Sequence, residues 1–319
     1  MNAAARPIHV PATDEMIYAY AAGVIDGDGH LACDAVPAMF WRVGLVVSMV
    51  DPAVPVYLHQ QLAGQLGTPP ASTCCDWRLF RRADVDHVVR RVVPHLRIKH
   101  AEGEAMLRLL DTLNAQPRYR VRTEHVTRAE RATRRYRRSA WRAAVQDAAF
   151  NVLAQRTIPT DATKLGVPPA VPGAPLPISE VTDVDAAYIA GILDAEGHLL
   201  AAEDSGTIGV KVGSTARILV DWLQHTAGGG VRLSHTTSAG NPYYVWSVYR
   251  HSDLDLLLGQ VMPYLVGKRA EARAMLAAIR FETQLRDAGR TVDPAVRREM
   301  RLAIRAARPR RRRRPDTPS

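Results

Sequence analysis

Hydrophobic positions recur with two different periods along the chain, and the same order of periods occurs twice. Residues 14–27 and 183–195 have apolar and small side chains at helical spacing, with Asp14 and Asp183 as the expected N-terminal caps. Segments in which apolar and polar residues alternate predict strands at 40–47, 75–82, 208–212, 231–234 and 244–248. Each half of the chain is therefore expected to begin with a helix and to continue into strands.

Further helical patterns interrupt and close these strand regions. Helices are expected to begin near Pro55 and Thr215, and the last long helix of each half near Lys99 and Lys268. The predicted order in each half is helix, hairpin, helix, hairpin, helices. The second hairpin of the first half is expected to be the shorter one, because residues 67–82 span fewer positions than their counterparts.

The two halves are copies of one domain, because three blocks of sequence recur in the same order. AYAAGVIDGDGHL from residue 19 matches AYIAGILDAEGHL 168 positions later, from residue 187. WRLFRRADVD from residue 77 matches WSVYRHSDLD from residue 246, and VPHLRIKHAEGEAML, ending at 107, matches MPYLVGKRAEARAML, ending at 276. The last two pairs are both 169 positions apart.

Composition separates the copies from the segments around them. Between positions 118 and 142 ten arginines stand against two acids, and a stretch rich in Pro and Ala follows as an extended linker. The chain ends in RPRRRRRPDTPS, which is expected to be a disordered basic tail. We expect a first domain at 14–116, an Arg-rich helical insert and linker at 117–180, a second domain at 181–290, and a helix with the tail at 291–319.

The overall charge points to a polyanionic partner. The 319 residues have a formal net charge of +10, and nucleic acid is the polyanion that soluble basic proteins meet most often. The three cysteines, Cys33, Cys74 and Cys75, form no CxxC pair, which predicts a reduced, cytoplasmic protein without structural zinc. No apolar run has membrane length and no signal-peptide pattern is present.

Small residues form a stripe along the first helix of each copy. They recur every fourth position, at Ala19, Gly23 and Gly27 and at Ala187, Gly191 and Ala195. Positions four apart lie on one helical face, so each stripe lets another backbone approach closely. Glycine inside a helix costs roughly 0.5–1 kcal/mol relative to alanine, which close contact must offset. The stripes are therefore expected to pack against each other as the domain interface.

An acid stands at the end of each stripe, Asp28 in the first copy and Glu196 in the second. A carboxylate at a helix C-terminus lies at the unfavourable end of the macrodipole. Packing the two helices together also brings the two acids close, so that they repel unless a positive charge lies between them. A divalent metal ion fits that position.

These residues carry a resemblance to a known family. AAGVIDGDG at 21–29 and IAGILDAEG at 189–197 resemble the two motifs of single-chain, free-standing LAGLIDADG homing endonucleases, and VPHLRIK and MPYLVGK resemble a later segment of that family. The resemblance covers about 14–116 and 180–288. It implies an α+β fold of two pseudo-symmetric domains, each αββαββα with a curved antiparallel sheet, packed through the two motif helices.

The resemblance also implies a site and a reaction. Asp28 and Glu196 would bind Mg²⁺ or another divalent cation such as Mn²⁺ at the scissile phosphates, with the backbone carbonyls of Gly27 and Ala195 as further ligands. The earlier motif acids, Asp26 and Asp194, match positions that support the helix ends. The reaction would be hydrolysis of one phosphodiester in each DNA strand, giving a staggered break at a long target.

Two lysines complete the expected site. Lys99 and Lys268 match the basic pocket residue of the family. The chain contains only four lysines among its 42 basic residues, yet two of them stand at equivalent repeat positions. A compact ammonium fits beside a phosphate where a broad guanidinium does not, so we assign both lysines to catalysis.

The strands are expected to read double-stranded DNA, because a two-stranded ribbon fits the major groove. Alternation places polar side chains on the outer face of each sheet. The expected contacts are Arg42, Arg78, Lys211, Arg232, Ser234 and Ser247. Since the copies have diverged, a monomer with an asymmetric target is expected, and the Arg-rich segment and tail would add phosphate contacts.

The alternative is a protein of the same architecture that does not cut DNA, either an RNA maturase or a DNA-binding regulator. Such a protein needs the basic surface but not both acids and both lysines. All four are present, which favours the endonuclease. An intein is not favoured, because a terminal Cys or Ser and a His-Asn end are lacking.

Overall fold

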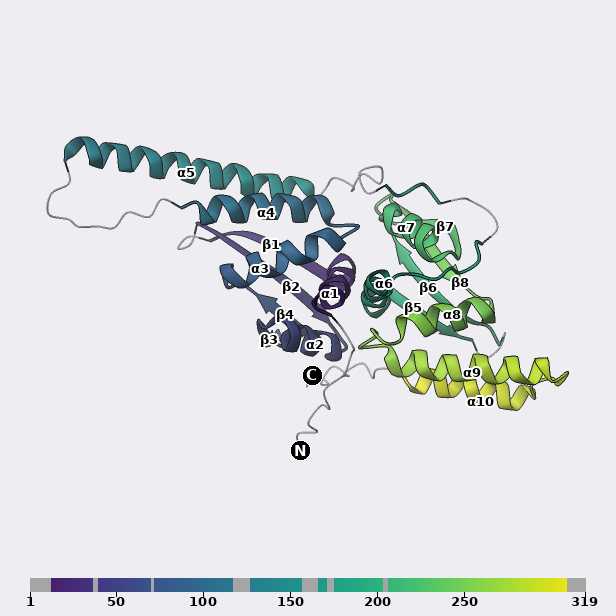
Figure 1. Ribbon diagram of the computed structural model, residues 1–319. Coiled ribbons are helices and arrows are strands. Elements are labelled where there is room, and N and C mark those ends of the chain that lie inside the picture. Colours follow the sequence, from purple (N-terminus) through teal and green to yellow (C-terminus); the bar gives the residue numbers. More distant parts are fainter. Residues whose placement is uncertain are drawn as a thin grey trace, which may run out of the picture.

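Two helices of equivalent sequence lie side by side at the centre of the molecule, with a four-stranded antiparallel sheet beyond each of them (Figure 1). The computed structural model describes residues 13–36, 40–69, 72–116, 127–156, 166–170, 175–202 and 206–308. The predicted α+β fold of two pseudo-symmetric domains that pack through their first helices is confirmed.

The first copy follows the predicted order of elements. These are α1 (Asp14–Asp28), β1 (Gly29–Val36), β2 (Phe40–Met49), α2 (Ala53–Leu62), β3 (Gln65–Gly67), β4 (Cys75–Leu79), α3 (Arg82–Val92), the short helix η1 (Val93–His95) and α4 (His100–Asn114). The sheet has the strand order β1-β2-β4-β3.

The second copy repeats this arrangement. Its elements are α6 (Asp183–Glu196), β5 (Gly197–Ala201), β6 (Ile208–Ser214), α7 (Arg217–Ala227), β7 (Gly230–Thr236), β8 (Pro242–Val248), α8 (His251–Val261) and α9 (Arg269–Asp287). The strand order, β5-β6-β8-β7, is the counterpart of the first. The predicted difference in hairpin length is confirmed, since β3 has three residues where β7 has seven.

Three strands were not predicted from the alternation, namely β1, β3 and β5. Strands β1 and β5 follow the motif helices with no turn in between, because Gly29 and Gly197 already have extended backbone angles. A side chain at Gly29 would place its Cβ 2.5 Å from the Cα of Ile25, so only glycine permits this abrupt change of direction. The apolar pattern of the helix therefore runs into the strand without a visible boundary.

The N-terminal caps also differ from the expectation. Thr13 and Thr182 occupy the cap positions, and Asp14 and Asp183 are the first helical residues. The Thr182 hydroxyl accepts a hydrogen bond from the backbone N–H of Asp185. This is the bond that an N-cap side chain makes to the first turn of a helix. The two aspartates instead place negative charge in the first turn, where the macrodipole favours it.

Equivalent tryptophans anchor the cores of the two copies. Trp77 on β4 and Trp246 on β8 are both fully buried. Their indole N–H groups donate to the carbonyls of Ala63 and Gly228, at 2.7 Å in each case. Each tryptophan thereby ties the helix that precedes the second hairpin to the sheet, and satisfies its only polar atom.

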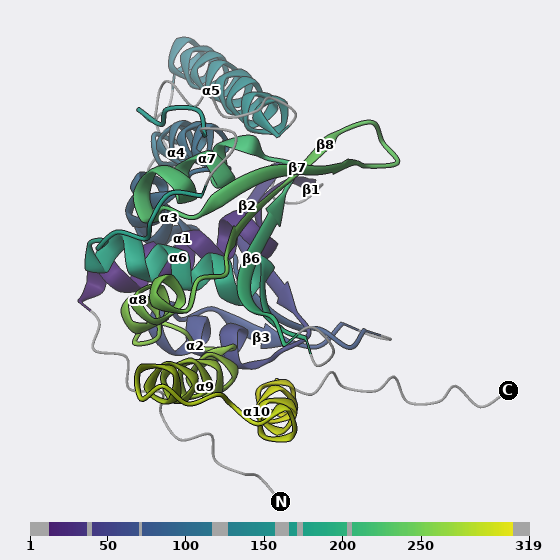
Figure 2. The ribbon, with the colours of Figure 1, turned by 90° about the vertical axis from the view of Figure 1, so that its right-hand side faces the viewer.

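Two further helices pack outside the repeated elements, α5 (Arg128–Gln155) on α4 and α10 (Pro294–Ala306) on α9 (Figures 1 and 2). The second half of α5 buries Val145, Ala149 and Val152, whereas its first half extends beyond α4. The remaining parts of the Arg-rich segment, at 117–126, and the basic tail from 309 onward lie outside the described residues.

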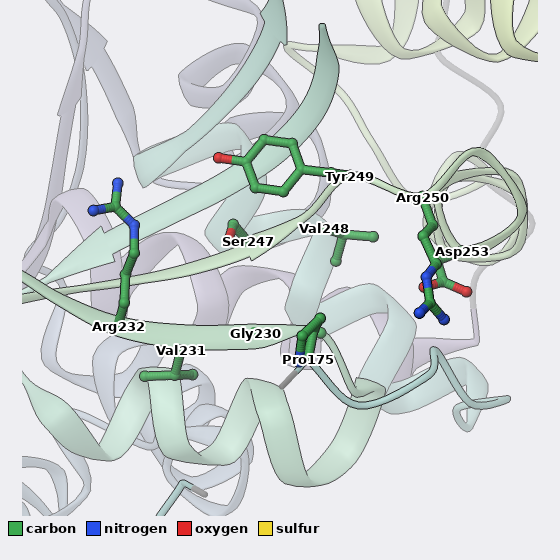
Figure 3. A pocket seen from close by; sticks show the side chains of 10 residues that line it. Pro175, Gly230, Val231, Arg232, Ser247, Val248, Tyr249, Arg250 and Asp253 are labelled. Carbon is green, nitrogen blue, oxygen red and sulfur yellow. The ribbon is translucent and has the colours of Figure 1, made fainter. Parts of the chain in front are cut away.

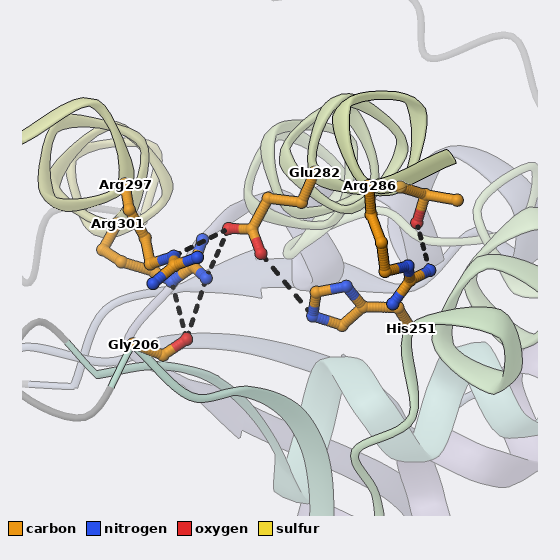
Figure 4. A network of polar contacts seen from close by, with 7 residues as sticks. Gly206, His251, Glu282, Arg286, Arg297 and Arg301 are labelled. Atoms are coloured by element: carbon orange, nitrogen blue, oxygen red, sulfur yellow. Dashed lines mark hydrogen bonds and ion pairs between the residues drawn. The ribbon is translucent and has the colours of Figure 1, made fainter. Parts of the chain in front are cut away.

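A buried arginine holds α10 in place (Figure 4). Arg301 is 0% exposed and donates to Glu282 on α9 at 2.7 Å and to the carbonyl of Gly206 at 2.8 Å. A charge this deeply buried is stable only when it is paired and hydrogen-bonded, as it is here.

Among the described residues, no helix is long and apolar enough to cross a bilayer.

Candidate functional site

The two motif helices approach each other as closely as their backbones allow. A Cβ at Gly23 would lie 2.2 Å from the carbonyl oxygen of Tyr188, and a Cβ at Gly191 would lie 2.2 Å from that of Tyr20. The structure brings the six small residues of the two stripes to this seam, where Ala19 and Ala187 are both 0% exposed. Any side chain at the two glycines is excluded by backbone of the other copy.

Crossed hydrogen bonds join the two copies beside this seam. The Tyr20 hydroxyl donates to Asp194 at 2.9 Å, and the Tyr188 hydroxyl donates to Asp26 at 2.8 Å. Burial raises the pKa of both tyrosines well above the usual value, and the neighbouring carboxylate adds to this effect. Both hydroxyls therefore remain protonated donors, and each acid depends on a tyrosine of the other copy.

The same two buried acids organise the loops that lead into the last helices. Asp26 accepts backbone N–H bonds from three consecutive residues that end at Lys99, at 2.6–3.1 Å. Asp194 accepts three such bonds from the residues that end at Lys268, at 2.7–3.1 Å. A carboxylate that accepts several backbone bonds fixes the loop around it. Asp26 and Asp194 thus fix the backbone position of Lys99 and Lys268.

Both lysines cap the motif helices. Lys99 Nζ donates to the carbonyls of Ile25 and Asp26 at 2.6 and 2.8 Å, and Lys268 Nζ donates to those of Leu193 and Asp194 at 2.7 and 2.5 Å. A cation at this end satisfies free carbonyls and opposes the macrodipole. Burial lowers the pKa of each ammonium, and Asp26 or Asp194 works against that shift.

Asp28 and Glu196 end their helices next to each other at the solvent surface. A Cβ at Gly27 would lie 2.5 Å from the Cβ of Ala195 and 3.2 Å from the Cγ of Glu196, which shows how close the two chain ends are. Partial burial and, to a smaller extent, the charge of Glu196 together raise the pKa of the Asp28 carboxyl to about 6, against the opposing effect of Lys268 and Lys99.

This donor set fits a divalent cation that is completed by a ligand from outside the protein. Among the described residues, no group of three or more His, Cys, Asp or Glu side chains could enclose a metal ion. Magnesium, however, usually keeps several waters and takes only one or two protein carboxylates together with substrate phosphates. Asp28 and Glu196, with the carbonyls of Gly27 and Ala195 beside them, meet that requirement.

The raised pKa predicts how stability depends on pH without metal. From pH 4 to 6 an unfolded Asp28 loses its proton while the folded one keeps it, so the free energy of unfolding falls over this window. Asp28→Asn is therefore expected to be more stable than the wild type at pH 7.5 in EDTA, and equally stable near pH 4. We expect a difference of about 1 kcal/mol, because the carboxylate is exposed and solvent screens it.

Urea unfolding of both proteins at the two pH values measures this difference. Asp14→Asn, at the exposed first turn of the same helix, is the control and should lose stability slightly at pH 7.5. A wild type that is more stable than Asp28→Asn in EDTA at pH 7.5 would contradict the predicted repulsion.

The outer faces of the sheets present the basic and hydroxyl side chains that were expected to contact DNA. The exposed or partly exposed ones are Arg42, Arg78, Lys211, Arg232 and Ser234. Ser247 shares this face and is 9% exposed, on a strand that lies between β6 and β7. Its outward direction agrees with the expectation, and a contact between Ser247 and DNA stays a prediction.

A cation lies over each of two equivalent aromatic rings on the outer faces, although the two cations come from different strand positions. The Arg42 guanidinium is 4.7 Å from the ring centre of Phe80, and Lys211 Nζ is 5.8 Å from that of Tyr249. Each ring occupies the space beside a glycine of the neighbouring strand, Gly44 or Gly209, where a Cβ would collide with it. This contact holds the positive charge on the face of the sheet by cation–π attraction.

A cavity of about 260 Å³ lies at the edge of the second outer face (Figure 3). Arg232, Ser247 and Tyr249 line it from β7, β8 and the residue after β8, and Pro175 of the linker closes one side. The linker is held there by two backbone bonds between Leu176 and Gly229, at 2.8 and 2.9 Å. The linker thus extends the outer face at its edge.

Sequence reasoning did not identify two contributors to the site. The crossed tyrosines lie in register in the repeated block, so the signal was present but had no assigned role. Arg97 was not singled out at all, although its guanidinium lies over Tyr188 and Trp222 of the other copy, at 5.5 and 5.1 Å from the ring centres. Arg97 has no basic counterpart in the second copy, where Val266 stands, so the repeat did not mark it.

Comparison with known proteins agrees with this architecture. No family model and no curated protein matches the chain. Among solved structures it is similar to the LAGLIDADG homing endonuclease I-GzeII in complex with its DNA target, with a TM-score of 0.54, 14% identity, and coverage of 89% of this chain and 96% of that one.

Two structures of the LAGLIDADG homing endonuclease I-SmaMI are also similar. The one bound to cleaved DNA has a TM-score of 0.56, 13% identity and coverage of 91% and 95% of the two chains. The one bound to an uncleaved target in the presence of calcium ions has a TM-score of 0.55, 13% identity and coverage of 91% and 98%. At such identity the similarity shows a common fold.

Proposed function

Because this chain has the fold of the LAGLIDADG homing endonucleases, we propose that it is a site-specific DNA endonuclease that makes a double-strand break. The observation that supports this most is the pair Asp28 and Glu196, which lie against each other at the ends of two packed helices. The solved structures of this fold include complexes with DNA targets, one of them cleaved. A divalent cation, Mg²⁺ or Mn²⁺, supplies at these carboxylates a Lewis acid that activates water and stabilises the leaving 3′ oxygen.

The surrounding residues prepare the site for a phosphate. Lys99 and Lys268 each use two N–H groups to cap a helix, and the third remains for a phosphate oxygen. Charge that grows on the phosphate in the transition state then meets an ammonium that is already held in place. The crossed tyrosine bonds keep Asp26 and Asp194, and through them the lysines, at fixed positions.

Binding is assigned to the outer faces of the two sheets. Arg42, Arg78, Lys211, Arg232 and Ser234 would contact bases and phosphates in the major groove. The two faces carry different residues, so the proposed target is asymmetric. The staggered position of the cuts is proposed from the resemblance to the homing endonucleases. One chain supplies both copies, and we therefore propose that the protein works as a monomer.

Cleavage selection on a randomised DNA library, and on genomic DNA of the host, in the presence of magnesium is the direct test. One long asymmetric site with cuts offset between the strands is the expected result. The maturase alternative is favoured instead if no library member is cut and the protein binds intron RNA tightly. Binding to one DNA site without cutting would favour the regulator.

The exposed half of α5 is proposed to add phosphate contacts outside the target core. Arg128 to Arg142 contains seven arginines and one acid, and most of these side chains are solvated. Changing Arg131, Arg135 and Arg138 to Gln is expected to weaken DNA binding at low salt. The slope of log K against log salt should become shallower by roughly 0.9 for each lost phosphate contact.

Fluorescence anisotropy with target DNA over a series of salt concentrations gives this slope. The matched control removes three exposed arginines, Arg280 and Arg286 on α9 and Arg290 just after it, far along the chain from α5. Equal changes of slope in the two triple variants would mean that the net charge of the protein, and not the exposed half of α5, accounts for the effect.

A further inference from the structure

Two arginines outside the repeated blocks hold equivalent positions in the two copies. Arg156 follows α5, and its Nε lies 2.8 Å from a carboxylate oxygen of Glu102. Arg308 follows α10, and its Nε lies 2.6 Å from a carboxylate oxygen of Glu271. The two glutamates are 169 positions apart, as the repeat requires, but the two arginines are 152 apart.

The second contact of each arginine is equivalent as well. Arg156 Nη2 donates to the carbonyl of Leu31 at 2.5 Å, and Arg308 Nη2 donates to that of Leu199 at 2.6 Å. These carbonyls lie three residues beyond the two acids at the helix ends, on β1 and β5. Arg156 also lies 3.4 Å from Nε2 of His30 on β1.

The helices that deliver the arginines pack in the same register. When Arg156 is aligned with Arg308, Ala149 of α5 corresponds to Arg301 of α10, and both are 0% exposed. Val152 corresponds in the same way to Ile304, again with 0% exposure for both. Helix α5 is therefore the counterpart of α10, although the Arg-rich segment shows no sequence resemblance to the second copy.

Each arginine connects the two elements that form the site in its copy. On one side is the strand that directly follows Asp28 or Glu196, and on the other is the first turn of the helix that follows Lys99 or Lys268. The glutamate side chains are only 7% and 4% exposed. A buried carboxylate needs a paired cation, and the planar fork of arginine reaches a carboxylate and a carbonyl together.

We propose that Arg156 and Arg308 are positioning residues, each of which fixes the motif acid of its own copy relative to the lysine of that copy. Loss of one arginine then disturbs one half of the site more than the other. A variant of Arg156 is therefore expected to slow the cut of one DNA strand, and a variant of Arg308 the cut of the other strand. The strand-specific part of this inference rests on the proposed endonuclease function.

A nicking assay on a supercoiled plasmid with the target site, labelled separately on each strand, tests the strand preference. Arg156→Ala should slow one cut about 10- to 100-fold, the loss typical of a residue that orients a metal ligand, with little effect on the other cut. Arg308→Ala should slow the opposite cut, so that the variants accumulate nicks in different strands. Equal slowing of both strands by each variant, or no slowing, overturns the inference.

Conservative variants separate positioning from folding. Arg156→Lys and Arg308→Lys keep the charge beside the buried glutamate but lose the fork, so we expect folding to be retained and strand-specific activity to be only partly restored. Arg290→Ala, at an exposed position just after α9 that has no role in the site or in DNA binding, is the matched control and should leave both cuts unchanged. If the Lys variants cut both strands at the wild-type rates, charge alone is sufficient and positioning is excluded.

Hydrogen exchange of the free protein tests the positioning without any cleavage. Arg156→Lys should increase exchange in peptides that cover 29–33 and leave 197–201 protected, and Arg308→Lys should give the reverse. Unchanged or equal exchange in both segments overturns the inference. If the wild type cuts no DNA at all, the endonuclease function fails, whereas this measurement still decides whether the arginines position the strands.

Discussion

Asp28→Asn and Glu196→Gln are each expected to reduce double-strand cleavage in magnesium by about a thousandfold or more, which corresponds to about 4 kcal/mol of transition-state stabilisation. Each change removes one of the two charged ligands that the structure offers to a divalent ion, and no other described acid cluster can replace it. DNA affinity in EDTA should remain within a fewfold of the wild-type value, or rise slightly, because a negative charge near the phosphates is lost.

Cleavage of target DNA under single-turnover conditions, together with binding of the same DNA in EDTA, measures both expectations. Asp14→Asn, at the far end of the same helix as Asp28, removes an equal charge away from the site and should cut normally. If the double variant Asp28→Asn with Glu196→Gln still cuts both strands in magnesium, the assignment of the site is wrong.

Gly23→Ala and Gly191→Ala are expected to show the largest losses of stability. One added methyl group in either helix would lie 2.2 Å from a carbonyl oxygen of the other copy, and backbone cannot move aside as a flexible side chain can. Overpacking usually costs about 1–3 kcal/mol. We expect about 3 kcal/mol or more here, because the helices must separate along the whole seam.

Chemical denaturation of each variant measures the loss, and Gly259→Ala is the matched control. Gly259 is also in the interior of a helix, α8, but no atom lies within 4 Å of its Cβ position. Alanine should therefore stabilise the protein there by up to about 1 kcal/mol, through its higher helix propensity. Similar effects at all three positions would show that propensity, and not close approach, dominates.

The fold could be predicted from the sequence because the repeat supplies each signal twice. Helical spacing was clear in the motif helices, and the equivalent acids and lysines identified one another across the two copies. The strands β1 and β5 were missed, since Gly29 and Gly197 change the direction of the chain without the turn residues that usually mark a boundary. Their existence was implied only by the hairpin expected after each first helix and by the family resemblance, and not by a strand pattern of their own.

Contacts between the copies were not accessible to sequence patterns. Nothing in the chain shows that the Tyr20 hydroxyl bonds to Asp194 and not to an acid of its own copy. The lysines were recognised by their rarity, yet their role at the helix carbonyls depends on where the next helix begins in space. Arg156 and Arg308 escaped notice because their spacing differs from that of the repeat. The catalytic and DNA-contact roles of all these residues remain predictions.

The direct passage from helix to strand at Asp28 and Gly29 has a mechanical consequence. Helix α1 ends at Asp28 and strand β1 begins at the next residue, so no loop separates the carboxylate from the sheet. Because no flexible loop lies between them, a movement of the strand also moves the carboxylate. If DNA binds to the outer faces as proposed and shifts a sheet, β1 moves Asp28 with it, and β5 moves Glu196 in the same way. The distance between the two carboxylates would therefore depend on how well the proposed DNA target fits both sheets.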